Sequence, residues 1–323
     1  MDNRHSARTN ERIKPRTDLE LIMVTVAVVA VFFMSLGRIA AIAAFFDGDE
    51  EEQMTTVVTK GDEEQEEEGA EEAEGEAAQN HKLDYDLTQY ASDEGAAGKL
   101  YSYLDTYPEA AYILRNLDLY PQQMLEFVAR FPEAMGFAAS YLDFDRMNYQ
   151  PELDLSGEVT RGEMPYLLQW DSRWGYLEYG DGMIGYSGCG PTCLSMVAMY
   201  YYGWDNNDPI AVARYADEND YYVSGSGSSW TLMSKGCKDF DLIAKEIILD
   251  ENAMVKALEA SKPIICAMGP GVFTDNGHYI VLTGYVDGAF TIHDPNSPAN
   301  TARTWTYNEI KDQIRNIWSF APV

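Results

Sequence analysis

The segment GYSGCGPTCLSMVAMYYYG, residues 185–203, decides how the rest of the chain is interpreted. Glycines flank Cys189, and apolar residues then recur at helical spacing, so that Cys193, Val197 and Tyr200 share one face. Cys189 is therefore predicted to open a helix, where unpaired N–H groups and the positive end of the dipole stabilise a thiolate. Its own N–H is a candidate donor to an oxyanion. The pattern indicates a nucleophilic cysteine.

A buried structural cysteine is the alternative for Cys189, because most free cysteines behave as small hydrophobic residues. The flanking Gly188 and Gly190 favour the nucleophile, since glycine lets a substrate carbonyl approach the backbone closely.

A cysteine nucleophile needs a base, and the chain has four histidines. His5 and His81 lie in the N-terminal tail and the linker, which leaves His278 and His293. His278 opens the predicted strand GHYIVLTGY, so its ring should lie at the end of a sheet, and it is the preferred base.

The base must be oriented by a third group, for which Asp294 and Asn296 are candidates. Asp294 is preferred because it lies one hairpin beyond His278, so neighbouring strands would bring the two side chains together. Adjacent strand residues point to opposite faces, so His293 should then face away from the site. The alternative role of Asp294 is that of a turn residue before Pro295.

In the C-terminal half of the chain, one helical segment after Cys189 is followed by segments with a β pattern. Strands are predicted at Ile264–Met268, Tyr279–Tyr285 and Phe290–His293, with a hairpin turn at residues 286–289. A helix followed by an antiparallel sheet is an α+β arrangement. The serine- and glycine-rich segment 224–230 is either a lid over the cleft or a plain surface loop.

Residues 81–150 are predicted to form a small all-α region. The similar phrases TYPEAAYILRN, LYPQQMLEFVAR and RFPEAMGFAASY each place proline where the first turn of a helix tolerates it. Short helices packed like a repeat, acting as a spacer or a substrate-side collar, fit this pattern best.

The N-terminal part divides into three segments. Residues 1–18 are a basic tail expected in the cytoplasm, residues 19–46 are apolar enough for one transmembrane helix, and residues 47–80 are an acidic linker. A cleaved signal peptide is the alternative to the anchor. The anchored interpretation places the domain at residues 160–323 outside the cell membrane.

Composition excludes some classes of function. The net charge of -30 argues against binding nucleic acid, which needs basic residues to neutralise phosphates. Four scattered cysteines do not form a disulfide scaffold or a zinc ribbon, and no cofactor or metal is expected.

The phrases Gln169-Trp170-Asp171, GCGPTC, GHYIVLTGY and HDP, taken in order from Glu163 onward, resemble a C39-like peptidase domain. This resemblance implies a papain-like cysteine peptidase fold with Cys189, His278 and Asp294 as the triad. It also implies that Gln169 supplies the side-chain oxyanion donor. The helical phrases resemble those that precede such domains in surface proteins of Gram-positive bacteria.

The sequence thus predicts a cysteine peptidase that hydrolyses peptide bonds outside the membrane through a thioester. Its expected partners are a peptide or protein substrate and, through one helix, the membrane. Cleavage of cell-wall muropeptides by the same triad, and a catalytically idle surface binding module, are the alternative functions.

Overall fold

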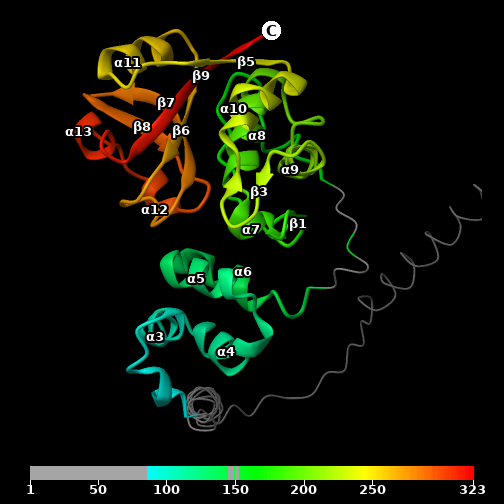
Figure 1. Ribbon diagram of the computed structural model, residues 1–323, viewed down its shortest axis with the longest axis vertical. Coiled ribbons are helices and arrows are strands. Elements are labelled where there is room, and N and C mark those ends of the chain that lie inside the picture. The colour runs from blue at the N-terminus through cyan, green and yellow to red at the C-terminus, as the bar shows by residue number, and fades with distance from the viewer. Residues whose placement is uncertain (1–85, 145–148, 150–152) are drawn as a thin grey trace, which may run out of the picture. The chain divides into compact units, whose positions relative to one another are not determined.

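The computed structural model describes residues 86–144, 149 and 153–323 (Figure 1). The predicted basic tail, transmembrane helix (19–46) and acidic linker (47–80) lie outside these residues. Within the described ranges, no helix combines the length and the apolar character needed to cross a membrane.

The first part of the described chain is helical, as its proline-led phrases predict. Pro121 caps α5 and Pro132 opens η3, positions where the missing N–H of proline costs nothing. Leu100, Ile113 and Met124 are fully buried in its core. The elements are η1 (Leu87–Tyr90), α3 (Ala96–Ser102), α4 (Ala110–Arg115), η2 (Leu117–Leu119), α5 (Gln122–Arg130), η3 (Pro132–Ala134) and α6 (Met135–Ala139). We call residues 86–144 the helical region.

The rest of the chain mixes helices and strands. Its helices are α7 (Ile184–Ser187), α8 (Cys189–Tyr202), α9 (Pro209–Glu218), α10 (Trp230–Ser234), η4 (Gly236–Phe240), α11 (Glu251–Glu259), α12 (Pro298–Thr301) and α13 (Tyr307–Ile310). Its strands are β1 (Glu178–Tyr179), β2 (Gly182–Met183), β3 (Tyr222–Val223), β4 (Gly227–Ser228), β5 (Leu242–Glu246), β6 (Ile264–Met268), β7 (His278–Val286), β8 (Ala289–His293) and β9 (Ile314–Pro322).

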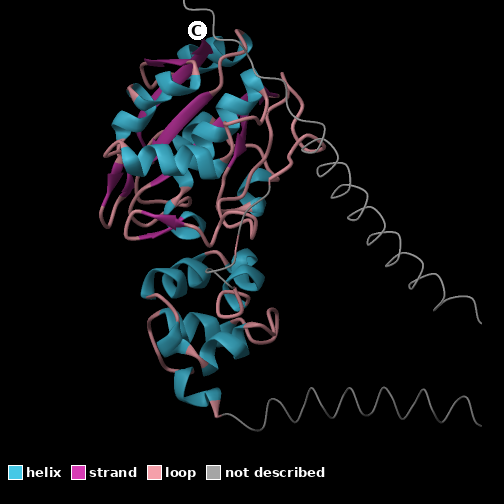
Figure 2. Ribbon diagram, turned by 90° about the vertical axis from the view of Figure 1, so that its right-hand side faces the viewer, coloured by secondary structure: helices cyan, strands magenta, loops and turns pink. Residues whose placement is uncertain are grey.

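Five strands, among those drawn in magenta in Figure 2, form one antiparallel sheet in the order β5-β9-β6-β7-β8. Its residues alternate between two cores. Ile265 and Val281 pack with residues of α8 on one face, and Ile264 and Ile280 pack with Met254 of α11 on the other. The α+β architecture with an antiparallel sheet is therefore confirmed.

The helix α8 lies in one of the two cores, in contact with β7 of the sheet and with α9 (Figure 1). Every residue from Gly190 to Met199 is buried, which explains why the helix is apolar on all sides. Packing along most of α8 therefore holds its N-terminus, which carries Cys189, in place.

The predicted strands agree with the structure. β6 has the predicted bounds, β7 extends one residue further at each end, and β8 begins one residue earlier. The hairpin between β7 and β8 turns at Asp287 and Gly288, which both have positive φ (52° and 82°). Asp-Gly suits this turn because both central residues must adopt the left-handed conformation. The turn brings the beginning of β7 beside the end of β8.

Candidate active site

Cys189 is the first residue of α8, where sequence analysis placed it. All four cysteines are unpaired, but Cys189 is half-buried, whereas Cys193, Cys237 and Cys266 are buried. Burial raises the pKa of each of these three thiols, which disfavours their thiolates. Cys189 is therefore the cysteine best placed to meet a substrate.

The glycines beside Cys189 have a packing role that sequence analysis did not anticipate. A Cβ atom on Gly188 would lie 2.6 Å from the carbonyl oxygen of Ile184. A Cβ atom on Gly190 would lie 2.3 Å from Oγ of Ser228. Close packing of the helix N-terminus accounts for both glycines without invoking the approach of a substrate.

His278 is the first residue of β7 and is 4% exposed. Its Nε2 lies 2.7 Å from Oδ1 of Asp294. Burial lowers the pKa of His278, but the charge and hydrogen bond of Asp294, together with Cys189, raise it to about 10. The imidazole thus favours the protonated form.

Asp294 follows the last residue of β8 and is fully buried. Besides His278, its Oδ1 accepts a hydrogen bond from the backbone N–H of Asn296 (2.9 Å). Its Oδ2 accepts one from the side-chain amide of Asn300 (2.7 Å). These donors compensate the burial of the carboxylate and fix it against the imidazole.

Asn296, the other candidate for the orienting group, lies near the opposite nitrogen of the same imidazole. Its Nδ2 is 3.5 Å from Nδ1 of His278, whereas Asp294 faces Nε2. Trp170 donates from Nε1 to the backbone carbonyl of Asn296 (2.9 Å) and holds the segment in place. Of the two candidates, Asp294 thus lies closer to the imidazole, and Asn296 lies near its other nitrogen.

His293 lies apart from this cluster. It pairs with Val281 across the hairpin, its Nδ1 donates to the carbonyl of Pro165 (3.0 Å), and its ring packs on Tyr166. Burial lowers its pKa, so the neutral ring is favoured. The contacts of His293 are those of a packed core histidine.

Gln169 is buried at 1% exposure. Its Nε2 donates to the carbonyl of Gly185, four residues before Cys189, and its backbone N–H donates to the carbonyl of Pro295. Gln169 thus joins the segment before the nucleophile to the segment after Asp294. Its contacts are with these backbone groups, and its role as an oxyanion donor stays a prediction.

Cys189 opens onto a groove of about 920 Å³. Asn296 and residues 274–277, which precede His278, contribute to its lining. Further lining comes from the helical region, which sequence analysis interpreted as a spacer or a substrate-side collar. The segment 224–230 also contributes, because residues 225–227 belong to the β3–β4 hairpin at the edge of the groove.

That hairpin is fixed in place. The hydroxyl groups of Tyr222 and Ser224 both donate to the carboxylate of Asp181, and Oγ of Ser228 bonds the hydroxyl of Tyr179 (2.7 Å). Most of the segment 224–230 therefore belongs to a hairpin that these hydrogen bonds hold beside the groove.

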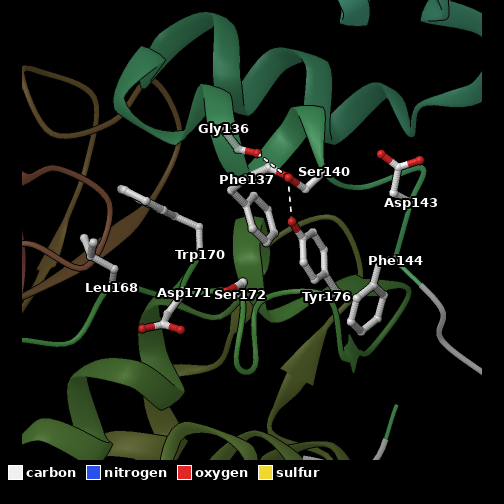
Figure 3. A pocket seen from close by; sticks show the side chains of 10 residues that line it. All are labelled: Gly136, Phe137, Ser140, Asp143, Phe144, Leu168, Trp170, Asp171, Ser172 and Tyr176. Atoms are coloured by element: carbon white, nitrogen blue, oxygen red, sulfur yellow. Dashed lines mark hydrogen bonds between the residues drawn. The ribbon is translucent and has the colours of Figure 1, made fainter. Parts of the chain in front are cut away.

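A second pocket of about 580 Å³ lies between α6 and the loop 168–172 (Figure 3). Its wall is largely aromatic, with the rings of Phe137 and Tyr176 stacked at 4.3 Å. Ser140 donates to the carbonyl of Gly136 at its rim (Figure 3). Cys189, His278 and Asp294 do not line this pocket, so we assign it no chemistry.

Among residues 86–144, 149 and 153–323, no group of three His, Cys, Asp or Glu side chains lies close enough together to hold a metal ion.

Residues 162–321 match the model of the Peptidase_C39 like family, so this part of the chain is a Peptidase C39-like domain. The family is one of cysteine peptidases, which implies peptide substrates. We refer to residues 162–321 as the C39-like domain.

Two solved structures resemble the chain. One is the peptidase domain of Streptococcus ComA, a bifunctional ABC transporter involved in a quorum-sensing pathway; it is 17% identical, with a TM-score of 0.34, over 42% of this chain and 93% of that one. The other is described as a C39-like peptidase from Bacillus anthracis; it is 14% identical, with a TM-score of 0.34, over 51% of this chain and 98% of that one. A comparison with curated proteins finds no match.

Proposed function

We propose that the C39-like domain hydrolyses peptide bonds with Cys189 as nucleophile, His278 as general base and acid, and Asp294 as the orienting group. One observation carries the proposal: Cys189, half-buried at the start of α8, helps to stabilise the charged form of an imidazole whose Nε2 lies 2.7 Å from a fully buried carboxylate. This is the geometry that nucleophilic catalysis by cysteine requires.

The residues act in two steps. The thiolate of Cys189 attacks the substrate carbonyl, and the C–N bond breaks as protonated His278 gives its proton to the leaving amine, which leaves a thioester. Neutral His278 then takes a proton from water, whose oxygen attacks the thioester, and the thiolate and the carboxylic acid product are released. The Cys189 N–H and Gln169 are the proposed oxyanion donors.

The raised pKa of His278 supports the first step. An imidazole that keeps its proton at neutral pH can pair with a thiolate and is ready to protonate the leaving group. Asp294 stabilises that charge without itself having to accept the proton.

The membrane anchor is part of the proposal. The basic residues before the apolar segment 19–46 and the acidic residues after it support an N-terminus in the cytoplasm and a C39-like domain outside. Protease treatment of intact cells is expected to release a C-terminal fragment. A domain that stays protected until the cells are lysed would contradict this topology.

Labelling with a thiol-reactive peptidyl electrophile tests the catalytic assignment. Peptide mapping of the labelled full chain is expected to find the label on Cys189 in preference to the three buried cysteines. Cys189→Ala is expected to abolish turnover of a peptide substrate, whereas Cys193→Ala retains substantial activity. Equal labelling of several cysteines, or unchanged turnover by Cys189→Ala, would exclude the proposed nucleophile and favour an idle binding module.

A further inference from the structure

We propose that the helical region forms one wall of the substrate site, so that an extended segment of polypeptide lies between it and the C39-like domain while Cys189 attacks. This inference rests on the proposed function and names the part of the molecule that holds the substrate. It gives the helical region a function of its own.

The lining of the groove is the first observation. Residues of α3 and α5, together with Phe131, line the groove from the helical region, among them Lys99, Gln123, Glu126 and Arg130. Cys189 lines the same groove, so a ligand that fills it contacts both parts of the chain.

The second observation is a bond from α5 to the loop that precedes the catalytic histidine. Arg130, the last residue of α5, forms an ion pair with Asp275. Its Nη2 also donates to the carbonyls of Gly271 (3.0 Å) and Val272 (3.3 Å). This loop leads directly into His278, so α5 is tied to the strand that carries the base.

A third contact reaches the other side of the catalytic pair. Glu133, in η3, accepts a hydrogen bond from the hydroxyl of Ser297 (3.0 Å). The backbone N–H of Ser297 in turn donates to the carbonyl of Asp294 (3.3 Å). Arg130 and Glu133 thus attach one corner of the helical region to the loops before His278 and after Asp294, and this fixes the wall relative to the site.

The chemistry of the two walls identifies the ligand. Phe127 and Phe131, whose ring centroids are 5.4 Å apart, are largely buried and contribute a small apolar area, while exposed Lys99 and Glu126 offer charges of both signs. On the other wall, residues 225–227 and Gly277 leave the backbone open to close approach by another main chain. A groove of this mixed character suits an extended polypeptide of varied side chains.

Two neighbouring glutamines provide a matched test. Gln122 and Gln123 are both exposed on α5, but only Gln123 lines the groove. In the full chain carrying Cys189→Ala, each is replaced by Trp, and binding of fluorescein-labelled, denatured casein is measured by anisotropy. Thermal melting checks that both variants stay folded.

Gln123→Trp is expected to weaken casein binding about tenfold because the indole occupies the groove, while Gln122→Trp changes it less than about twofold. Equal casein binding by the two variants, or no casein binding by the parent chain with Cys189→Ala, would contradict the proposal that the helical region forms a wall of the substrate site. Turnover is measured separately on the chain that retains Cys189. If the chain binds casein but does not cleave it, the proposed function is contradicted, while the proposal that the helical region helps to bind polypeptide is supported.

Discussion

The helical region and the C39-like domain bury different kinds of side chains. The buried polar and charged residues of the described chain all lie in or beside the C39-like domain and include Gln169, His278 and Asp294, whereas the core of the helical region is apolar. Buried polar groups are costly unless they are hydrogen-bonded, so they are concentrated where they have a use. Under the proposed function, this comparison places the chemistry in one part of the chain and a wall of the substrate site in the other.

This division has a kinetic meaning. Changes among the buried polar groups of the C39-like domain should act on the chemical step and lower kcat. Changes on the groove-facing side of the helical region should act on substrate binding and raise KM. Mutations in each part can therefore test the division.

The largest effect is expected from the two histidines of the C39-like domain. His278→Ala removes the base and should lower kcat/KM about a thousandfold, whereas His293→Ala removes a hydrogen bond to Pro165 and the ring contact with Tyr166 and should cost less than about tenfold. Assaying both on one peptide, with thermal melts as a control for folding, separates them. An inactive His293→Ala beside an active His278→Ala would reverse the assignment of the base.

Asp294→Asn is expected to have an intermediate effect, a loss of about a hundredfold in kcat, because an amide still contacts the imidazole but cannot offset its charge. The pH profile sharpens this prediction. Asp294 helps to raise the pKa of His278 to about 10, so kcat/KM of the parent chain should fall on the alkaline side near that pH.

Without the carboxylate, the burial of His278 lowers its pKa, so the imidazolium loses its proton at lower pH. The alkaline limb of Asp294→Asn should therefore move toward neutral pH. A profile that keeps its alkaline limb while kcat falls would show that Asp294 acts by packing and not by its charge.

The smallest effect is expected in the helical region. Arg130→Ala should raise KM for casein about fivefold and leave kcat within about twofold, because its ion pair is partly exposed and its loss loosens the wall without touching Cys189. Arg130→Lys should recover part of the loss.

Arg303→Ala is the matched control for Arg130. It breaks the exposed ion pair of Arg303 with Glu309, which lies in the C39-like domain and does not line the groove. KM should then be unchanged. An equal rise in KM for both variants would show that Arg130 has no particular connection with the substrate site.

Much of the C39-like domain could be predicted because its signals are local. Helical spacing after Cys189 and the Asp287-Gly288 turn each depend on a few neighbouring residues. The hairpin then brings His278 to Asp294 without any further information. The segment 224–230 was harder to interpret, since serine and glycine are typical both of loops and of tight hairpins.

The groove wall could not be predicted in the same way. Arg130 and Asp275 are 145 positions apart, and no pattern near either residue indicates the other. The prolines of the helical region predict where helices begin, but they do not show what those helices pack against. Likewise, Gly188 and Gly190 suggested substrate access until Ile184 and Ser228 supplied their packing partners.

The position of β9 affects the order in which the sheet can form during synthesis on the ribosome. Within the described sheet, β9 lies between β5 and β6, so β5 can join the sheet only once β9, which is synthesised much later, is available. Cys189 also emerges well before His278 and Asp294, by roughly ten seconds at about 5–20 residues per second. During that interval the thiol has no imidazole beside it, so under the proposed mechanism the nascent chain stays inactive until His278 and Asp294 have been synthesised.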